Sequence, residues 1–177
     1  MLIKLLIFVL ILGGLIVLLT VRKASRQYHR GVRASLWDGS PLDMDPERAR
    51  RFIEDIPRQA DKHRELVKRN FATELSYRKS DFARLDEVIE KGWGHSTPKR
   101  IDAVVVGFGC YFGETIRRLQ GGEWAYDKGR GIVLRDVGGR AVVEPFDKVR
   151  RRFRNGDRDS LSLFYLALTR KLGGGGQ

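Results

Sequence analysis

The hydrophobic pattern begins with an unbroken apolar run at the N-terminus. Residues 5–21 carry no charge, and with Leu2 and Ile3 they are enough for a helix of about 30 Å, the thickness of the hydrocarbon layer of a membrane. A cleaved signal peptide is the alternative, but it requires small neutral residues after the run, where this chain has Arg22 and Lys23. The pattern therefore predicts an uncleaved transmembrane anchor over residues 1–22.

Helical periodicity begins at residue 45. Asp45-Pro46-Glu47 is typical of a helix start, and apolar residues then recur at helical spacing over 52–75, with an interruption at Pro57. This pattern predicts either two helices or one kinked helix, with Arg and Lys on the outer face. Ser80-Asp81 predicts the start of the next helix, which we expect to end at Gly92.

The segment 101–120 is compatible with two structures. An apolar run followed by Gly107 and Gly109 and then by a helical pattern has the outline of a dinucleotide-binding turn. That fingerprint requires a third glycine where this chain has Phe112, and no further βα units follow it. We therefore favour one long buried helix from about Asp102 to Leu119, whose glycines allow neighbouring elements to approach closely.

Further along, the pattern changes to short alternating segments that turn residues separate. It predicts a three-stranded antiparallel meander over 124–126, 132–134 and 141–144. We expect a short helix from Pro145 to about Arg154, and then a last apolar helix that Asp157 or Asp159 caps.

These elements predict the fold class α+β, with an N-terminal transmembrane helix, a helical region, and a small antiparallel three-stranded sheet packed by helices. The 177 residues then divide into an anchor, a basic juxtamembrane segment with its linker, one globular domain, and a flexible Gly-rich tail, at residues 1–22, 23–44, 45–172 and 173–177. The globular part is long enough to form a core of its own.

Basic charge is concentrated beside the apolar run. The formal net charge is +12, and residues 22–37 hold no acid and five basic residues: Arg22, Lys23, Arg26, Arg30 and Arg33. The positive-inside rule then predicts a single-pass protein of the plasma membrane with its C-terminal domain in the cytoplasm. The arginines either bind anionic lipid, with Tyr28 and Trp37 at the interface, or act only as a topology signal. Charge placed there is a weak indication of a nucleic-acid partner.

Cys110 is the single cysteine, so the chain has neither an internal disulfide nor a cysteine-based zinc site. With His95, from the preceding loop, it would form a minimal nucleophile pair. A small core residue is the more common role of a cysteine in an apolar, Gly-rich segment, and we favour that role. No cofactor and no metal are expected.

Glu114 is the acidic residue with the most distinctive neighbours. Arg117 and Arg118 follow it at positions i+3 and i+4, which predicts an ion pair on the helix surface worth a few tenths of a kcal/mol. The alternative places Glu114 in a polar cleft, where it would form a binding or catalytic site with Arg117, Trp124 and Tyr126.

The densest basic run of the domain lies at 148–154. It consists of Lys148, Arg150, Arg151, Arg152 and Arg154. Such a run could bind the phosphates of nucleic acid or of lipid headgroups, but it contains no known base-reading motif. We favour a solvated helix face.

The order of a GxYxGExxRRxxGGxW motif, short strands, a basic helix and a final apolar helix resembles a family of small bacterial membrane-anchored domains of uncharacterised function. The resemblance covers roughly residues 80–170 and implies an α+β domain with a helix over 102–119, but no activity. The matching residues are Ser80, Leu85, Asp86, Gly109, Tyr111, Gly113, Glu114, Gly121, Gly122, Trp124, Gly131, Val133 and Gly156.

The function expected from these features is that of a membrane-tethered, non-enzymatic module that interacts with a protein or with lipid. Two alternatives stay open. One is an enzyme that uses a cleft centred on Glu114, and the other is a nucleic-acid-binding protein that uses the basic run at 148–154.

Overall fold

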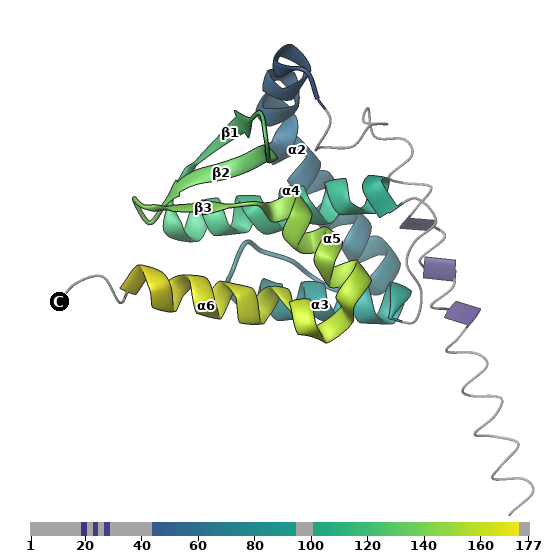
Figure 1. Cartoon of the computed structure of the whole chain (residues 1–177). Coiled ribbons are helices and arrows are strands. Elements are labelled where there is room, and N and C mark those ends of the chain that lie inside the picture. Colours follow the sequence, from purple (N-terminus) through teal and green to yellow (C-terminus); the bar gives the residue numbers. More distant parts are fainter. Residues whose placement is uncertain (1–18, 21–22, 25–26, 29–43, 95–100, 174–177) are drawn as a thin grey trace, which may run out of the picture.

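A long apolar helix, α4 (Ile101–Gln120), occupies the centre of the domain. In the computed structural model, which describes residues 19–20, 23–24, 27–28, 44–94 and 101–173, α4 lies between a small sheet and the helices α3 (Asp81–Trp93) and α6 (Leu161–Gly173) (Figure 1). Every residue of α4 from 108 to 116 is buried. A stretch of helix that is covered on all sides needs no polar face, and all residues from 104 to 113 are accordingly apolar, aromatic or glycine.

Three glycines of α4 make room for aromatic side chains. A Cβ atom at Gly107 would lie 2.6 Å from the Tyr28 hydroxyl, one at Gly109 would collide with the Phe146 ring, and one at Gly113 with the Trp124 ring. The glycines that suggested a dinucleotide-binding turn therefore serve close packing, and the prediction of one helix is confirmed.

Helix α2 (Pro46–Phe71) packs across α4. Its start is as predicted, because Pro46 is its first residue and the Asp45 side chain accepts a hydrogen bond from the Arg48 amide (2.9 Å). Pro57 lies within this single helix and does not divide it into two. Helix α3 ends at Trp93, one residue beyond the predicted Gly92.

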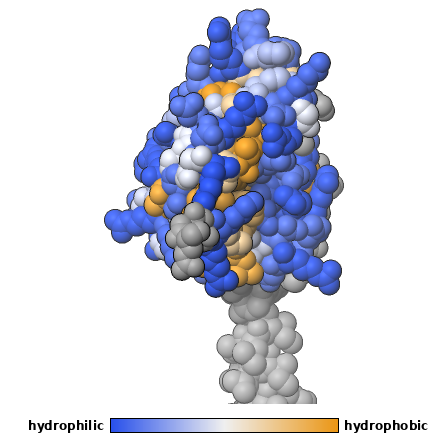
Figure 2. Space-filling view, turned by 60° about the vertical axis from the view of Figure 1, so that its left-hand side comes forward, coloured by the Kyte–Doolittle hydropathy of each residue, from blue (hydrophilic) through white to orange (hydrophobic). Residues whose placement is uncertain are grey.

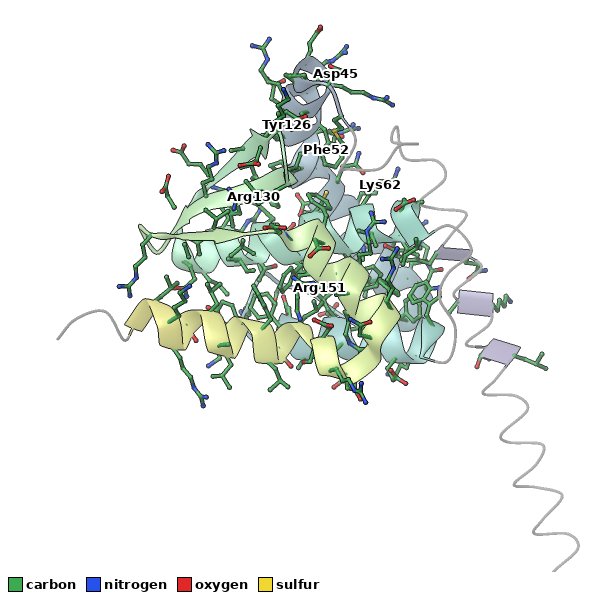
Figure 3. The ribbon with its side chains drawn as sticks, in the orientation of Figure 1. Asp45, Phe52, Lys62, Tyr126, Arg130 and Arg151 are labelled. Atoms are coloured by element: carbon green, nitrogen blue, oxygen red, sulfur yellow. The ribbon has the colours of Figure 1, made fainter. Side chains whose placement is uncertain are left out.

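The sheet is the predicted antiparallel meander, in the order β1 (Glu123–Asp127), β2 (Gly131–Val137) and β3 (Ala141–Val143). Trp124 lies opposite Leu134, and Tyr126 lies opposite Ile132. The Tyr126 hydroxyl donates a hydrogen bond to the Met44 carbonyl (2.8 Å), which joins β1 to the start of α2, where Tyr126 and Asp45 lie close together (Figure 3). With five α-helices and three strands among the described residues, the fold class is α+β.

Helix α5 (Pro145–Asn155) leads through a short 3-10 helix (Gly156–Asp159) into α6. The prediction that Asp157 or Asp159 caps α6 is wrong, because both lie in the 3-10 helix. The N-cap is Ser160, whose hydroxyl accepts a hydrogen bond from the Leu163 amide (3.2 Å), and the Asp86 carboxylate of α3 accepts hydrogen bonds from the amides of Leu161 and Ser162 (both 3.0 Å).

The predicted anchor lies outside the described residues except for Leu19 and Thr20, and the predicted tail lies outside them except for Gly173. Among the helices that are described, none is both long and apolar enough to cross a membrane. The transmembrane helix therefore stays a prediction.

Candidate functional site

Glu114 is fully buried and is the centre of a polar cluster. Its carboxylate accepts two hydrogen bonds from the Arg117 guanidinium (both 2.8 Å), one from Arg118 Nε (3.0 Å) and one from Trp124 Nε1 (3.3 Å). Arg117 and Arg118 are the predicted partners, but the pair is not the exposed one that we favoured from the sequence. Trp124 comes from β1, so the strand and the helix are joined at this carboxylate.

The protonation of Glu114 follows from these contacts. Burial by itself raises the pKa of the carboxyl group, but the hydrogen bonds from Arg117, Arg118 and Trp124 outweigh burial and hold the pKa below its ordinary value. Glu114 is therefore a carboxylate at neutral pH, with donors on both oxygens. Such a group joins structural elements and is poorly suited to the transfer of protons.

The cluster continues from Arg118 into the loop between α2 and α3. The Arg118 guanidinium lies 3.6 Å from the centre of the Tyr77 ring, and the Tyr77 amide donates to the Tyr111 hydroxyl (2.8 Å). That hydroxyl donates in turn to Asp81 (2.6 Å), which is fully buried. Tyr77 has φ of 58°, a left-handed conformation that is costly for a side chain of this size, and these contacts hold it there.

Glu114→Gln is expected to lower the free energy of unfolding by about 2 kcal/mol, because charge-assisted hydrogen bonds from two arginines are lost. Glu123→Gln is the matched control, since Glu123 is exposed and next to Trp124 in the sequence; we expect a change within about 0.5 kcal/mol. The measurement is denaturant unfolding of the full chain in detergent micelles. Unchanged stability in Glu114→Gln would contradict the structural role.

The other candidates for catalysis do not join this cluster. The hydroxyl of Tyr126 points away to Met44, and His95 lies outside the described residues. Cys110 is fully buried, and burial raises the pKa of its thiol well above the ordinary value, as expected for a core residue. Among the described residues, no group of three or more His, Cys, Asp or Glu side chains is placed to hold a metal ion.

Most of the basic run on α5, which includes Arg151 (Figure 3), is neutralised by carboxylates within the domain. Four of its residues pair with carboxylates: Lys148 with Asp159 (2.7 Å), Arg150 with Asp102 (2.7 Å), Arg151 with Asp147 (3.0 Å) and Arg152 with Asp86 (2.9 Å). The Arg152 side chain is only 2% exposed. Arg154 is exposed and is the member of the run without an acidic partner in the described part of the chain. The run therefore offers an anion far less charge than its sequence suggests.

Tyr28 does not lie at a membrane interface, which corrects the expectation from the sequence. It is fully buried in the core of the domain, where its ring contacts those of His63, Phe71, Trp93 and Phe108. Its hydroxyl lies 2.6 Å from His63 Nδ1. An aromatic residue soon after an anchor fits both positions, so the sequence could not distinguish them.

Of the five basic residues that were predicted to lie beside the membrane, only Lys23 is described, and it is exposed; Arg22, Arg26, Arg30 and Arg33 lie outside the described residues. On the face shown in Figure 2, charged residues predominate and apolar residues form a narrow band between them. This view shows no broad apolar surface.

No protein-family model, curated protein or solved structure matches this chain. The resemblance to small bacterial membrane-anchored domains therefore stays a prediction, and the site has to be interpreted from its own geometry.

Proposed function

We propose that this protein is a membrane-tethered interaction module that holds its α+β domain directly against the cytoplasmic face of the plasma membrane. The observation that carries the proposal is the burial of Tyr28 in the domain core. Six residues lie between Val21, the end of the apolar run, and Tyr28, and even a fully extended chain spans at most about 25 Å over these seven steps. A domain that holds Tyr28 in its core therefore cannot move far from the bilayer.

The contacts of Tyr28 support a fixed attachment. Its ring lies among aromatic side chains from three helices, with His63 and Phe71 on α2, Trp93 on α3 and Phe108 on α4. Gly107 gives the ring and hydroxyl the space they need. Through Tyr28, the segment that follows the apolar run thus contributes to the core, and we expect this attachment to set the position of the domain relative to the membrane.

The two alternatives have less support among the described residues. An enzyme centred on Glu114 would need a carboxylate with a free oxygen, whereas both oxygens of Glu114 accept hydrogen bonds from protein donors. Nucleic-acid binding through α5 would need free cations, whereas four of its five basic residues pair with carboxylates.

Trypsin treatment of membranes that carry the full chain tests this proposal. We expect the chain to sediment with the membranes and trypsin to release a folded fragment that begins within residues 23–27, because the basic residues Arg22, Lys23 and Arg26 lie between the apolar run and Tyr28. Release is expected from inside-out vesicles and not from right-side-out vesicles, as a cytoplasmic domain requires. A chain that stays in the supernatant before trypsin is added would overturn the anchor.

Two variants at residue 28 test the attachment in the same vesicles. Tyr28→Ala is expected to speed the release, because the ring no longer holds the segment in the core. Tyr28→Phe is the matched control, since it keeps the ring and loses only the hydroxyl next to His63. Equal rates of release for the two variants would contradict a fixed attachment.

A further inference from the structure

The surface between α2, the following loop and α3 contains an open hollow of about 410 Å³. Its lining residues are mostly charged: Arg64, Glu65, Lys68, Glu74, Leu75, Ser76, Arg78 and Arg84. Four are basic and two acidic, and the only apolar one, Leu75, is buried. The surface of the hollow is therefore mainly polar, which suits a small anion better than a ring or an acyl chain.

Several N–H groups around the hollow have no acceptor within the described residues. The side chain of Arg78 is exposed and has no ion pair or hydrogen bond there, and Arg64 approaches carboxylates only at 3.7 and 3.8 Å, beyond hydrogen-bond distance. Arg84 uses its Nη1 for Asp81 (2.9 Å) and for the Glu74 carbonyl (3.3 Å), which leaves its other nitrogens for a ligand.

The acidic residues of the hollow do not close it to an anion. Lys68 pairs with Glu74 at 2.8 Å, but the two side chains are 60% and 77% exposed, so the pair is weak and an anion can replace Glu74. Glu65 is 59% exposed and can turn away into solvent.

The loop that carries Arg78 is held in one conformation before any ligand binds. The Asp81 carboxylate accepts hydrogen bonds from the amides of Ser76 (2.7 Å) and Arg78 (3.1 Å), and Tyr111 accepts one from Tyr77. Those bonds maintain the left-handed backbone conformation at Tyr77, which is energetically unfavourable for a tyrosine. Strained residues of this kind are found most often at functional sites. A loop already ordered loses little entropy when Arg78 engages a ligand.

From these observations we infer that the hollow binds a phosphate monoester group, held by Arg64, Lys68, Arg78 and Arg84. The two N–H groups of a guanidinium fork match the oxygens of phosphate. A phosphate dianion is also attracted more strongly by four cations than a monovalent carboxylate is. The group can belong to free phosphate or a small phosphorylated molecule, or to the headgroup of a lipid beside the tether. The inference goes beyond the membrane tether and stands without it.

Titration of the full chain with inorganic phosphate tests the site, with the protein in nanodiscs of phosphatidylcholine and heat as the readout. We expect saturable binding that Arg78→Ala weakens about tenfold or more, the loss that follows when charge-assisted hydrogen bonds are removed. Lys79→Ala is the matched control, because Lys79 is exposed and adjacent but does not line the hollow; we expect a change of less than about twofold. No saturable binding, or equal weakening by the two substitutions, would overturn the inference.

Nanodiscs that also contain phosphatidic acid distinguish the two sources of the group. If the monoester headgroup of this lipid fills the hollow, phosphate binding disappears in these discs and returns when phosphatidylserine, a diester, replaces phosphatidic acid. If phosphate binds equally in all discs, the ligand is a free phosphate compound. Both outcomes support the site, and neither depends on how the domain is held at the membrane.

Discussion

Asp86→Ala is expected to lower the free energy of unfolding by about 3–5 kcal/mol, the range for removing one partner of a buried ion pair. The Asp86 side chain is 15% exposed and accepts hydrogen bonds from Arg152 Nε (2.9 Å) and Ser160 Oγ (2.8 Å). It also accepts them from the amides of Leu161 and Ser162. The substitution therefore removes the acceptor of two amides at the start of α6 and the least exposed partner of Arg152 together. Denaturant unfolding of the full chain in detergent micelles measures the loss.

Asp157→Ala is the matched control for Asp86→Ala. Asp157 also pairs with Arg152 (3.0 Å), but its side chain is 88% exposed, so we expect a loss of no more than about 1 kcal/mol. Asp86 joins α3, α5 and α6, whereas Asp157 lies only beyond the end of α5. Similar losses in the two variants would show that the pairing of Arg152 matters and that the connection between helices does not.

Helix starts were predictable from the sequence where the capping residue is local. Asp45 lies three residues before the amide that it caps, so a short motif was enough to predict the start of α2. Helix α6 also has a local cap, Ser160, but two of its first amides are bound by Asp86, 75 residues before Leu161 in the chain. Asp157 and Asp159 lie before the cap position, in the 3-10 helix, and the contribution of Asp86 is visible only from the packing of α3 against α6.

The residues of the candidate site were predictable from the sequence, but their burial was not. Helical spacing correctly indicated that Arg117 and Arg118 reach Glu114. The full burial of Glu114 depends on Trp124, which β1 places over Gly113. The spacing of Glu114 and its arginines along the helix carries no information on a contact with a strand. Tyr126 lies on the same strand as Trp124, but its hydroxyl donates a hydrogen bond to the Met44 carbonyl and not to Glu114.

The same limit applies to the basic run on α5. The sequence displays its cations, but their partners Asp86 and Asp102 lie on α3 and α4, far away in the chain. Charge counted along a sequence therefore overstates the charge that a folded surface offers. The arginines around the hollow beside α2 are spread over 64–84 and form no run, so their grouping became visible only with the fold.

His63 is expected to make the domain lose stability in mild acid. It is fully buried on α2, and burial lowers its pKa from 6.5 to about 3. The unfolded chain binds a proton as the pH falls below about 6.5, and the folded chain does not bind it until about pH 3. Stability is therefore complete above pH 6.5 and declines below it, by at most about 1.4 kcal/mol per pH unit and roughly 4–5 kcal/mol in total.

The surroundings of His63 explain why it stays neutral. Its Nδ1 lies 2.6 Å from the Tyr28 hydroxyl, and its Nε2 is buried with no hydrogen-bond partner among the described residues. Phe108 lies against its ring, and the small cavity beside it, about 10 Å³, is lined by Gln59 and Lys62 with no carboxylate to stabilise an imidazolium. A proton on His63 would have to be accommodated next to Lys62 and among aromatic rings.

His63→Asn isolates this effect, because asparagine does not titrate and its amide oxygen can accept the hydrogen bond from Tyr28. Unfolding free energies of the full chain and of the variant, measured from pH 7.5 to 4.5 in detergent micelles, should converge as the pH falls, by about 2.7 kcal/mol over this range. Carboxylates and the two other histidines are common to both proteins and cancel in the comparison. Parallel pH dependences would mean that His63 takes up its proton in the folded domain. The pocket around Tyr28 would then have to open to water.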